Sequence, residues 1–332
     1  MGKVITLGEI MLRLSTEIGV RLKCTSQLAV HYGGAEANVA ISLAHYQHEV
    51  AFVSKVPDSS LGEAVIAHLR GANVSCEHLL KGGSRLGTYY LETGSGKRSA
   101  KVIYDRAASS FASMKENEWS DDLFYGAELF HISGITPALS EKWQALTLSL
   151  IKEAKHAGCK ISFDVNYRGN LWTQQAAGEF LNKILPLVDY CSAGELDARH
   201  LLKIPTYQGE KSALIYYYQE IQARYPNIQV LYSTKRLVKS ASDNHLVGTL
   251  WVNGKYFESK SHHICPIVDR IGAGDTFSAG ILHGLLADET SQWTIDFATA
   301  AAALKHTVLG DDNQFNEEEV LSFLNDSGKI IR

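Results

Sequence analysis

Residues 268–280 read V-D-R-I-G-A-G-D-T-F-S-A-G, and this stretch is the part of the chain that decides its fold. A turn formed by Gly272, Ala273 and Gly274 leads directly into Asp275 and then into a helical pattern of apolar residues. The first turn of a helix has free N–H groups and the positive end of the helix dipole, and glycines there let an anion approach the backbone. We therefore predict that Gly272, Ala273 and Gly274 form an anion hole.

Asp275 stands in the first turn of this helix. An aspartate there would repel a phosphate if the turn served for binding alone. The position of Asp275 is explained if its carboxylate accepts the proton of a hydroxyl group that attacks a phosphoryl group. The alternative is an ordinary helix start that the aspartate caps. The pattern D-x-x-G-A-G-D-x-F-x-x-G, from Asp269 to Gly280, is far more specific than G-x-G-D and favours a catalytic base.

Upstream of this turn, short apolar segments alternate regularly with helical segments. This βαβ alternation predicts an α/β fold of three layers, α/β/α, with a mostly parallel central sheet. A hairpin follows at 248–252 and 255–257. The other predicted strands are 3–7, 50–56, 128–132, 160–165, 190–192 and 228–233, and the predicted helices are 61–70, 141–157, 175–185 and 211–224.

The size and charge of the chain limit its class. Of its 332 residues, 45% are hydrophobic and 20% charged, and the net charge is −4. These values suit a single α/β domain over residues 1–332, with excursions from it at approximately 11–32 and 85–110. The negative charge provides no general field for nucleic acid or an anionic membrane, so neither is an expected partner.

Cysteine and histidine spacing gives no metal or disulfide signature. The five cysteines show no C-x-x-C spacing and are odd in number, which predicts free thiols in a reducing compartment rather than disulfides or a cysteine-based zinc site. His262-His263 likewise lacks metal-ligand spacing. The first apolar run is broken at Gly8 and Glu9, and no segment reaches the ~20 apolar residues that span a bilayer. We therefore expect a cytoplasmic protein. The cysteines are Cys24, Cys76, Cys159, Cys191 and Cys265.

Two segments interrupt the α/β pattern. Residues 11–31 are more polar and predicted to be irregular. Within 85–106, two aromatic and β-branched segments, 88–91 and 100–104, flank a glycine-rich turn at 93–97, which predicts a β-hairpin. Such an inserted hairpin is typical of a lid or an oligomer surface.

The motifs together resemble a known family. Asp269 to Gly280 is similar to the C-terminal signature of ribokinase-like (PfkB-type) carbohydrate kinases, and Gly33-Gly34-Ala35-x-x-Asn38 resembles their N-terminal glycine motif. The resemblance extends over nearly the whole chain and includes the hairpin, which corresponds to the family's β-sheet lid. It implies ATP-dependent phosphorylation of a hydroxyl of a sugar-derived substrate, and a homodimer or higher oligomer formed through the lid. Mg²⁺ is the implied metal, and K⁺ is a candidate activator that the sequence leaves open.

By this resemblance Asp275 is the catalytic base, the glycine turn is the anion hole, and Gly33, Gly34 and Asn38 belong to the substrate site. The alternative for the glycine pair alone is a turn before a helix. Its pairing with the late motif favours the functional interpretation.

Two arginines indicate the charge of the substrate. Arg106 lies in the second arm of the hairpin, and Arg168 follows a buried parallel strand, where α/β proteins place ligands. In an acidic protein, two arginines directed at one cleft favour an anionic substrate, because a guanidinium binds a carboxylate through two hydrogen bonds.

The segments around these arginines, with 133–139 and Leu171-Trp172, resemble the 2-keto-3-deoxygluconate kinase branch of the family. The alternatives are that Tyr104 packs within the lid, that Asp311 lies in a solvated loop, and that Arg106 pairs with Asp105 or a surface acid. The branch implies that the sugar acid is contacted by Gly34, Tyr89, Tyr104, Arg106, Arg168 and Asp275, with a further role for Asp311.

The nucleotide side departs from the family pattern. Residues 192–195 read S-A-G-E, so Glu195 is present as a candidate that organises Mg²⁺ through water, but the usual asparagine is absent. Residues 233–238 read S-T-K-R-L-V and lack the glycines of the usual nucleotide loop. The predicted ATP-binding residues are Asn166, Arg168, Ser233, Lys235, Arg236, Gly272 and Gly274.

Two other functions remain open at this stage. A kinase for a neutral sugar such as fructose or ribose would share the fold and Asp275, but would have no use for the two arginines. A catalytically silent sugar-acid sensor on the same fold is kept open by the altered nucleotide loop, although the intact G-A-G-D argues against it.

Overall fold

The computed structural model describes residues 2–209 and 212–325. A ten-stranded sheet forms its centre. The strands of this sheet are β1 (Lys3–Leu7), β4 (Val50–Val56), β5 (Leu79–Lys81), β8 (Ala127–Ser133), β9 (Lys160–Asp164), β10 (Tyr190–Ser192), β11 (Val230–Ser240), β12 (Asp243–Val252), β13 (Lys255–Glu258) and β14 (His262–Ile264).

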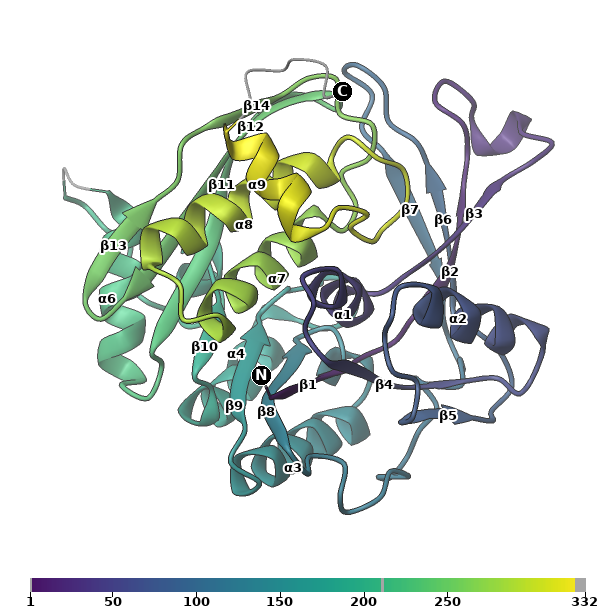
Figure 1. The fold of residues 1–332 in the computed structure, drawn as a ribbon, viewed down its shortest axis with the longest axis horizontal. Coiled ribbons are helices and arrows are strands. Elements are labelled where there is room, and N and C mark those ends of the chain that lie inside the picture. The colour runs from purple at the N-terminus through teal and green to yellow at the C-terminus, as the bar shows by residue number, and fades with distance from the viewer. Residues whose placement is uncertain (1, 210–211, 326–332) are drawn as a thin grey trace.

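The order of the strands is β13-β12-β11-β10-β9-β8-β1-β4-β5, and β14 pairs with β12 (Figure 1). Neighbours from β5 to β11 run parallel, whereas β12 is antiparallel to β11, β13 and β14. The mostly parallel sheet predicted from the sequence is therefore confirmed.

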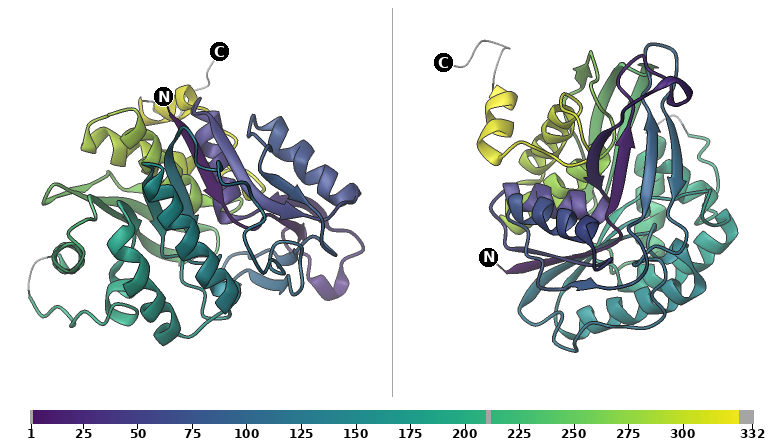
Figure 2. Two further views of the ribbon diagram at one scale, coloured as in Figure 1. Left: turned by 90° about the horizontal axis from the view of Figure 1, so that it is seen from below. Right: turned by 90° about the vertical axis from the view of Figure 1, so that its right-hand side faces the viewer.

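Helices cover both faces of the sheet, which makes three layers (Figure 2). Because both faces are covered, β1 carries apolar side chains on both sides: Val4 packs into one layer and Ile5 into the other. One face carries α1 (Ala35–His45), α2 (Ser60–Gly71), α7 (Ala273–Leu286), α8 (Ser291–Lys305) and α9 (Glu317–Asn325); the other carries α3 (Glu141–His156), α4 (Gln174–Ile184), α5 (Glu195–His200) and α6 (Ala213–Arg224). Short 3₁₀ helices lie at Leu22–Cys24, Pro137–Leu139 and Leu185–Leu187.

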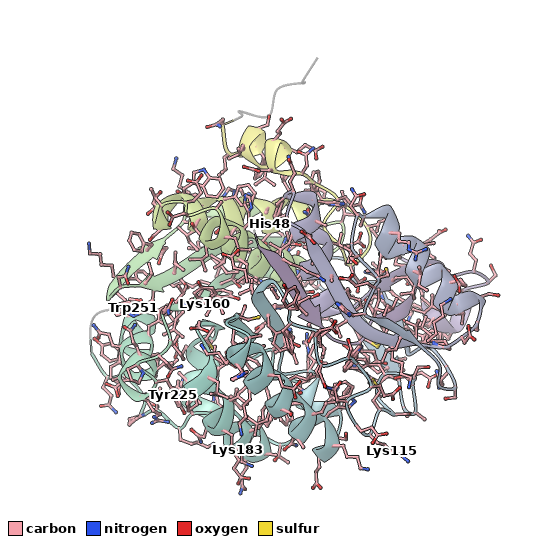
Figure 3. All side chains as sticks on the ribbon, turned by 60° about the horizontal axis from the view of Figure 1, so that its bottom comes forward. His48, Lys115, Lys160, Lys183, Tyr225 and Trp251 are labelled. Carbon is pink, nitrogen blue, oxygen red and sulfur yellow. The ribbon has the colours of Figure 1, made fainter. Side chains whose placement is uncertain are left out.

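Side chains fill the space between these layers, and exposed lysines such as Lys115 and Lys183 lie at the periphery (Figure 3). Among the described residues, no helix combines the length and the apolar character needed to cross a membrane.

A second, four-stranded sheet stands apart from the central one (Figure 2, right). It consists of β2 (Met11–Ser15), β3 (Ala29–Gly33), β6 (Thr88–Glu92) and β7 (Lys101–Asp105), in the order β3-β2-β6-β7. The hairpin predicted in this region is confirmed as β6 and β7. The prediction of irregular structure for 11–31 is wrong for β2 and β3. In β2 the buried Arg13 breaks the apolar alternation by which a strand is recognised, and β3 begins with two exposed residues.

The structure also corrects the region after residue 228. The sequence prediction ended the strand at Ser233 and treated 233–238 as a loop, but β11 continues to Ser240 and pairs with β12 from Asp243 onward. The outer half of this hairpin leaves the core, and Leu237 is 65% exposed, so the apolar pattern ends while the backbone ladder continues. The first residue of the helix predicted at 211–224 lies outside the described residues, and the helix is seen as α6.

Candidate active site

A cavity of about 1680 Å³ lies between the carboxyl ends of the central strands and the small sheet. Ala273 does not line it and is buried behind the glycine turn. The predicted site residues that do line it are Gly33, Gly34, Asn38, Tyr89, Tyr104, Arg106, Asn166, Arg168, Glu195, Ser233, Lys235, Arg236, Gly272, Gly274, Asp275 and Asp311. The structure therefore brings residues from distant parts of the chain around one space.

The glycine turn is the N-terminus of α7. Gly272 is its N-cap with a left-handed φ of 81°, and a Cβ there would lie 1.6 Å from the backbone oxygen of Asp311. Both the conformation and the space therefore require glycine. The Gly272 carbonyl accepts the Thr276 amide at 2.8 Å, which closes the first turn. The amides before Thr276 have no intrahelical partner by construction, so they are available to an anion in the cavity.

Asp275 lies in this first turn, and Asn38 Nδ2 donates a hydrogen bond of 2.6 Å to its Oδ2. Burial, with smaller contributions from the carboxylates of Asp164 and Glu36, raises the pKa of Asp275 to about 7, although Asn38 and Arg168 lower it. A carboxylate with a pKa near neutrality is suited to accept a proton in one step and lose it in the next.

Two further carboxylates, of Asp164 and Glu36, line the cavity with Asp275, and sequence reasoning missed both. Burial raises the pKa of Asp164 to about 6, and Asn166 Nδ2 donates to its Oδ2 at 3.1 Å. Glu36 is fully buried, which raises its pKa; its Oε1 accepts the amide and the hydroxyl of Ser133 at 3.0 and 2.7 Å. Glu36 lies between the two motif residues Gly34 and Asn38, and this position was the only signal for it.

Arg106 reaches the cavity from the small sheet and is held by Glu9. Its Nε donates to Glu9 Oε2 at 2.8 Å, its Nη2 contacts the same oxygen, and Ser109 Oγ donates to Glu9 Oε1. Asp105 pairs instead with Arg85, so the suggested pairing of Arg106 with Asp105 is absent from the contacts of these residues. The partner of Arg106 is a buried acid rather than a surface one.

Arg168 lies in the loop after β9 and lines the cavity. Its positive charge lowers the pKa of both Asp164 and Asp275, which places its guanidinium on the same side of the cavity as the proposed base.

Tyr89, Tyr104 and Asp311 lie together at the edge of the small sheet. The Tyr89 hydroxyl donates to the Asp311 carboxylate, and the two tyrosine rings are 5.7 Å apart between centroids. Tyr104 is 47% exposed, whereas Asp311 is 3% exposed, so Asp311 does not lie in a solvated loop.

Arg13 connects the small sheet to the glycine turn, a role that no motif in the sequence predicted. Its Nη2 donates to Asp269 Oδ2 at 2.5 Å and its Nη1 to Asp311 Oδ1 at 2.7 Å. Asp269 Oδ1 in turn accepts the Ile271 amide at 3.0 Å, which fixes the chain just before the turn. All three charged side chains are almost fully buried, so this network is a rigid link between the lid strand β2 and the anion hole.

The proposed nucleotide residues differ in where they point. Lys235 Nζ pairs with Glu258 at 2.6 Å and lies over the Tyr256 ring, so it is engaged away from the turn. Arg236 Nη2, by contrast, lies 4.0 Å from the place that a Cβ would take on Gly274. Arg270 is anchored to the carbonyl of Ala241 at 2.8 Å and lines the same side of the cavity.

Three acids that line the cavity, Glu195, Asp197 and Asp164, are the candidates for holding a magnesium ion. Glu195, the first residue of α5, pairs with Arg199 at 3.1 Å. Asp197 is more buried, accepts the Gly194 amide at 2.8 Å, and its charge contributes to the raised pKa of Asp164. Mg²⁺ prefers oxygen ligands, so these carboxylates are of the right chemical type to hold it, directly or through water.

Known proteins resemble this chain in both sequence and structure. A family model described as pfkB family carbohydrate kinase matches residues 1–318. A 2-dehydro-3-deoxygalactonokinase of Haloferax volcanii is 34% identical over 321 residues, 96% of this chain and 95% of the relative. The structure of a PfkB family carbohydrate kinase from Listeria grayi has 44% identity and a TM-score of 0.94, covering 98% of this chain and 100% of its own. The 2-dehydro-3-deoxygluconokinase of Thermotoga maritima has 36% identity, with the same TM-score and coverage.

Proposed function

The chain belongs to the pfkB family of carbohydrate kinases, and within this family we propose that it transfers the γ-phosphoryl group of ATP to the terminal hydroxyl of a keto sugar acid. The first substrate to test is 2-keto-3-deoxygluconate, with its 6-phosphate as product. One observation carries this proposal: Asp275, at the N-terminus of α7, lines the same cavity as Arg106 and Arg168. A proton acceptor, an anion hole and two cations for a carboxylate are thereby present in one space.

In the proposed reaction, Arg168 and Arg106 hold the substrate carboxylate, so that the hydroxyl at the other end of the sugar reaches Asp275. Asp275 accepts the proton of this hydroxyl as its oxygen attacks the γ-phosphorus. The amides of Gly272 and Gly274, which line the cavity, stabilise the charge on the transferring group. Bound Mg²⁺, held through Glu195 and Asp197, would neutralise phosphate charge. The small sheet closes over the substrate and excludes water.

The variant Asp275→Asn tests the mechanism. The amide keeps the size of the side chain but cannot accept the proton, so we expect turnover to fall by about 10²- to 10⁴-fold while sugar-acid binding, measured by calorimetry, stays close to that of the wild type. ADP release measured on both proteins gives the comparison. Near-normal turnover in the variant would remove Asp275 from the mechanism.

The substrate class is tested by competition between substrates. The relatives from Haloferax and Thermotoga are named for two epimers of one keto sugar acid, so both epimers belong in the assay with fructose. We expect the keto acids to be preferred, and Arg106→Ala to raise their KM about tenfold or more because a charge-assisted contact is lost. Arg85→Ala is the matched control, since this lid arginine pairs with Asp105. A preference for fructose overturns the assignment.

The same assay separates the kinase from a silent sensor. A sensor binds the sugar acid and releases no ADP, whereas the proposed enzyme releases one ADP for each sugar phosphorylated. Replacing K⁺ by Na⁺ tests activation by potassium. The carboxylates beside the turn, Asp269 and Asp311, are already paired with Arg13, so we expect equal rates in both salts.

We further propose that two copies associate through the small sheet. One face of this sheet carries a row of side chains that lie opposite one another across its four strands: Val30, Leu14, Tyr90 and Ile103. The residues on the two outer strands, Val30 and Ile103, are 56% and 44% exposed. Light scattering of the wild type should give a dimer, and Ile103→Glu a monomer. Leu61→Glu, at an exposed leucine on α2, should leave the mass unchanged. A monomeric wild type refutes this interface.

A cytoplasmic location is part of the proposal. All five cysteines lie within the described residues and are free thiols, as expected in a reducing compartment that supplies ATP.

A further inference from the structure

A group of potential metal ligands lies outside the active site, where β12 begins and β14 ends. Asp243, His263 and Cys265 each offer one ligand atom, and these atoms all lie within 4.8 Å of one another. His263 Nε2 is 2.9 Å from Asp243 Oδ1. The sequence spacing gave no hint of this group, because its members come from two separate strands.

The strand register explains why these side chains meet. β12 and β14 are antiparallel, with Asn244 opposite Ile264 and His245 opposite His263. One step beyond the Asn244–Ile264 pair, Asp243 faces Cys265. Side chains two residues apart on a strand share a face, so the two histidines, Asp243 and Cys265 all project from the same side of the ladder. The backbone therefore places the group, and no chance rotamer is needed to gather it.

The donor set points to one class of ion. A thiolate sulfur, an imidazole nitrogen and a carboxylate oxygen are the three ligand types of zinc sites, and the thiolate disfavours Mg²⁺ and Ca²⁺. His245 stacks on His263 with ring centroids 4.5 Å apart and planes 9° from parallel, which fixes the orientation of the His263 ring. Cys265 and His263 are exposed, so the ion has an open path and water can complete its coordination.

We propose that Asp243, His263 and Cys265 form a binding site for a zinc ion, or for a similar borderline-soft divalent cation. The site lies beside the turn that joins β11 to β12. In this turn, the Ala241 amide donates to Gly96 at the tip of the lid hairpin at 2.8 Å, and Arg270 of the anion-hole segment holds the Ala241 carbonyl. A bound ion ties β14 to the start of β12 and so stiffens the turn on which the lid tip rests.

Cobalt is the probe that reports the thiolate directly. Metal-free protein, prepared with a chelator and used without nucleotide or sugar, is titrated with Co²⁺ and then with Zn²⁺. We expect one equivalent of Co²⁺ to give a near-ultraviolet sulfur-to-cobalt band and the visible bands of a tetrahedral ion, and Zn²⁺ to displace both. Zinc should also raise the melting temperature.

Matched variants separate this site from adventitious binding. Cys265→Ser should abolish the sulfur band, and His263→Ala should weaken zinc binding at least tenfold. Cys24→Ser, at another exposed cysteine, and His262→Ala, at the neighbouring histidine, should bind like the wild type. Melting curves without metal show whether each variant is folded. The proposal is overturned if zinc fails to bind the wild type at micromolar concentration, or if Cys265→Ser retains the sulfur band. Because no substrate is present, neither result depends on the kinase assignment.

Discussion

The hydrogen bond from Asn38 to Asp275 makes a quantitative prediction about the pH dependence of the reaction. Asn38 lies on α1, far from Asp275 in the chain, and donates to its Oδ2 at 2.6 Å. This bond favours the ionised carboxylate and so lowers the pKa of Asp275, while burial raises it to a final value of about 7. The variant Asn38→Ala removes the bond and leaves burial in place. The pKa of Asp275 should therefore rise.

The size of the rise follows from the energy of the bond. A hydrogen bond to a charged group contributes about 1.5–3 kcal/mol, and one pKa unit corresponds to about 1.4 kcal/mol. Loss of the bond should therefore raise the pKa by about one to two units, from about 7 to roughly 8 or 9. Because the base must be ionised to accept a proton, kcat/KM of the variant should begin to fall at a correspondingly higher pH.

The assay is ADP release from pH 5.5 to 9.5 for wild type and variant, with saturating magnesium. The same substrates serve both enzymes, so their own titration cancels in the comparison. Asn170→Ala, at another asparagine that lines the cavity, is the control and should keep the wild-type acid limb. If the Asn38 variant loses activity equally at every pH, the asparagine only binds substrate and the reasoning about the pKa is refuted.

Three further predictions concern stability and the anion hole. Arg13→Ala should lower the free energy of unfolding by about 3–5 kcal/mol, because it leaves buried carboxylates unpaired. Chemical denaturation measures this change. The control Arg85→Ala removes an exposed ion pair and should leave the denaturation midpoint nearly unchanged. Gly272→Ala should abolish turnover because its Cβ would meet a backbone oxygen at 1.6 Å, whereas Gly126→Ala has open space, carries only the strain of its positive φ, and should stay active. Burial lowers the pKa of His131 to about 3, so between about pH 6.5 and 3 only the unfolded chain binds a proton at this residue. The free energy of unfolding should therefore fall across that window by about 1.4 kcal/mol per pH unit from this residue. The melting temperature of His131→Gln should decline less steeply as the pH is lowered. Equal slopes in the two proteins would contradict this assignment.

The sequence predicted the parts of the fold that are apolar and regular. The strand at 190–192 matches β10 to the residue, and the hairpin at 88–104 matches β6 and β7 closely, because both combine β-branched or aromatic residues with clear turn signals. The strands β2 and β3 and the outer half of β11 were missed, since they are held by backbone ladders and a charged network rather than by an apolar pattern.

The residues of the candidate site likewise fall into two groups, those that the sequence predicted and those that it did not. Residues within a motif, such as Asp275 and Asn38, were identified because their spacing is fixed by one helix or one turn. Arg13, Glu9 and Asp164 have no such spacing. Each becomes relevant only through a partner that the fold brings from another part of the chain, such as Asp269 for Arg13 and Arg106 for Glu9.

The charged side chains of the cavity indicate how a nucleotide can bind without the usual glycine-rich loop. Lys235 is paired with Glu258, so this cation is not fully available to phosphates. Arg236 lies on the hairpin that replaces the loop, and Arg270 lies in the segment just before α7 and is anchored to the turn of that hairpin. We therefore expect two guanidinium groups and the helix dipole to receive the triphosphate, a role that glycine-rich backbone amides have in the family pattern. Charge on a rigid β-ladder can thus take the place of close backbone approach, so loss of the glycines does not by itself imply loss of the nucleotide.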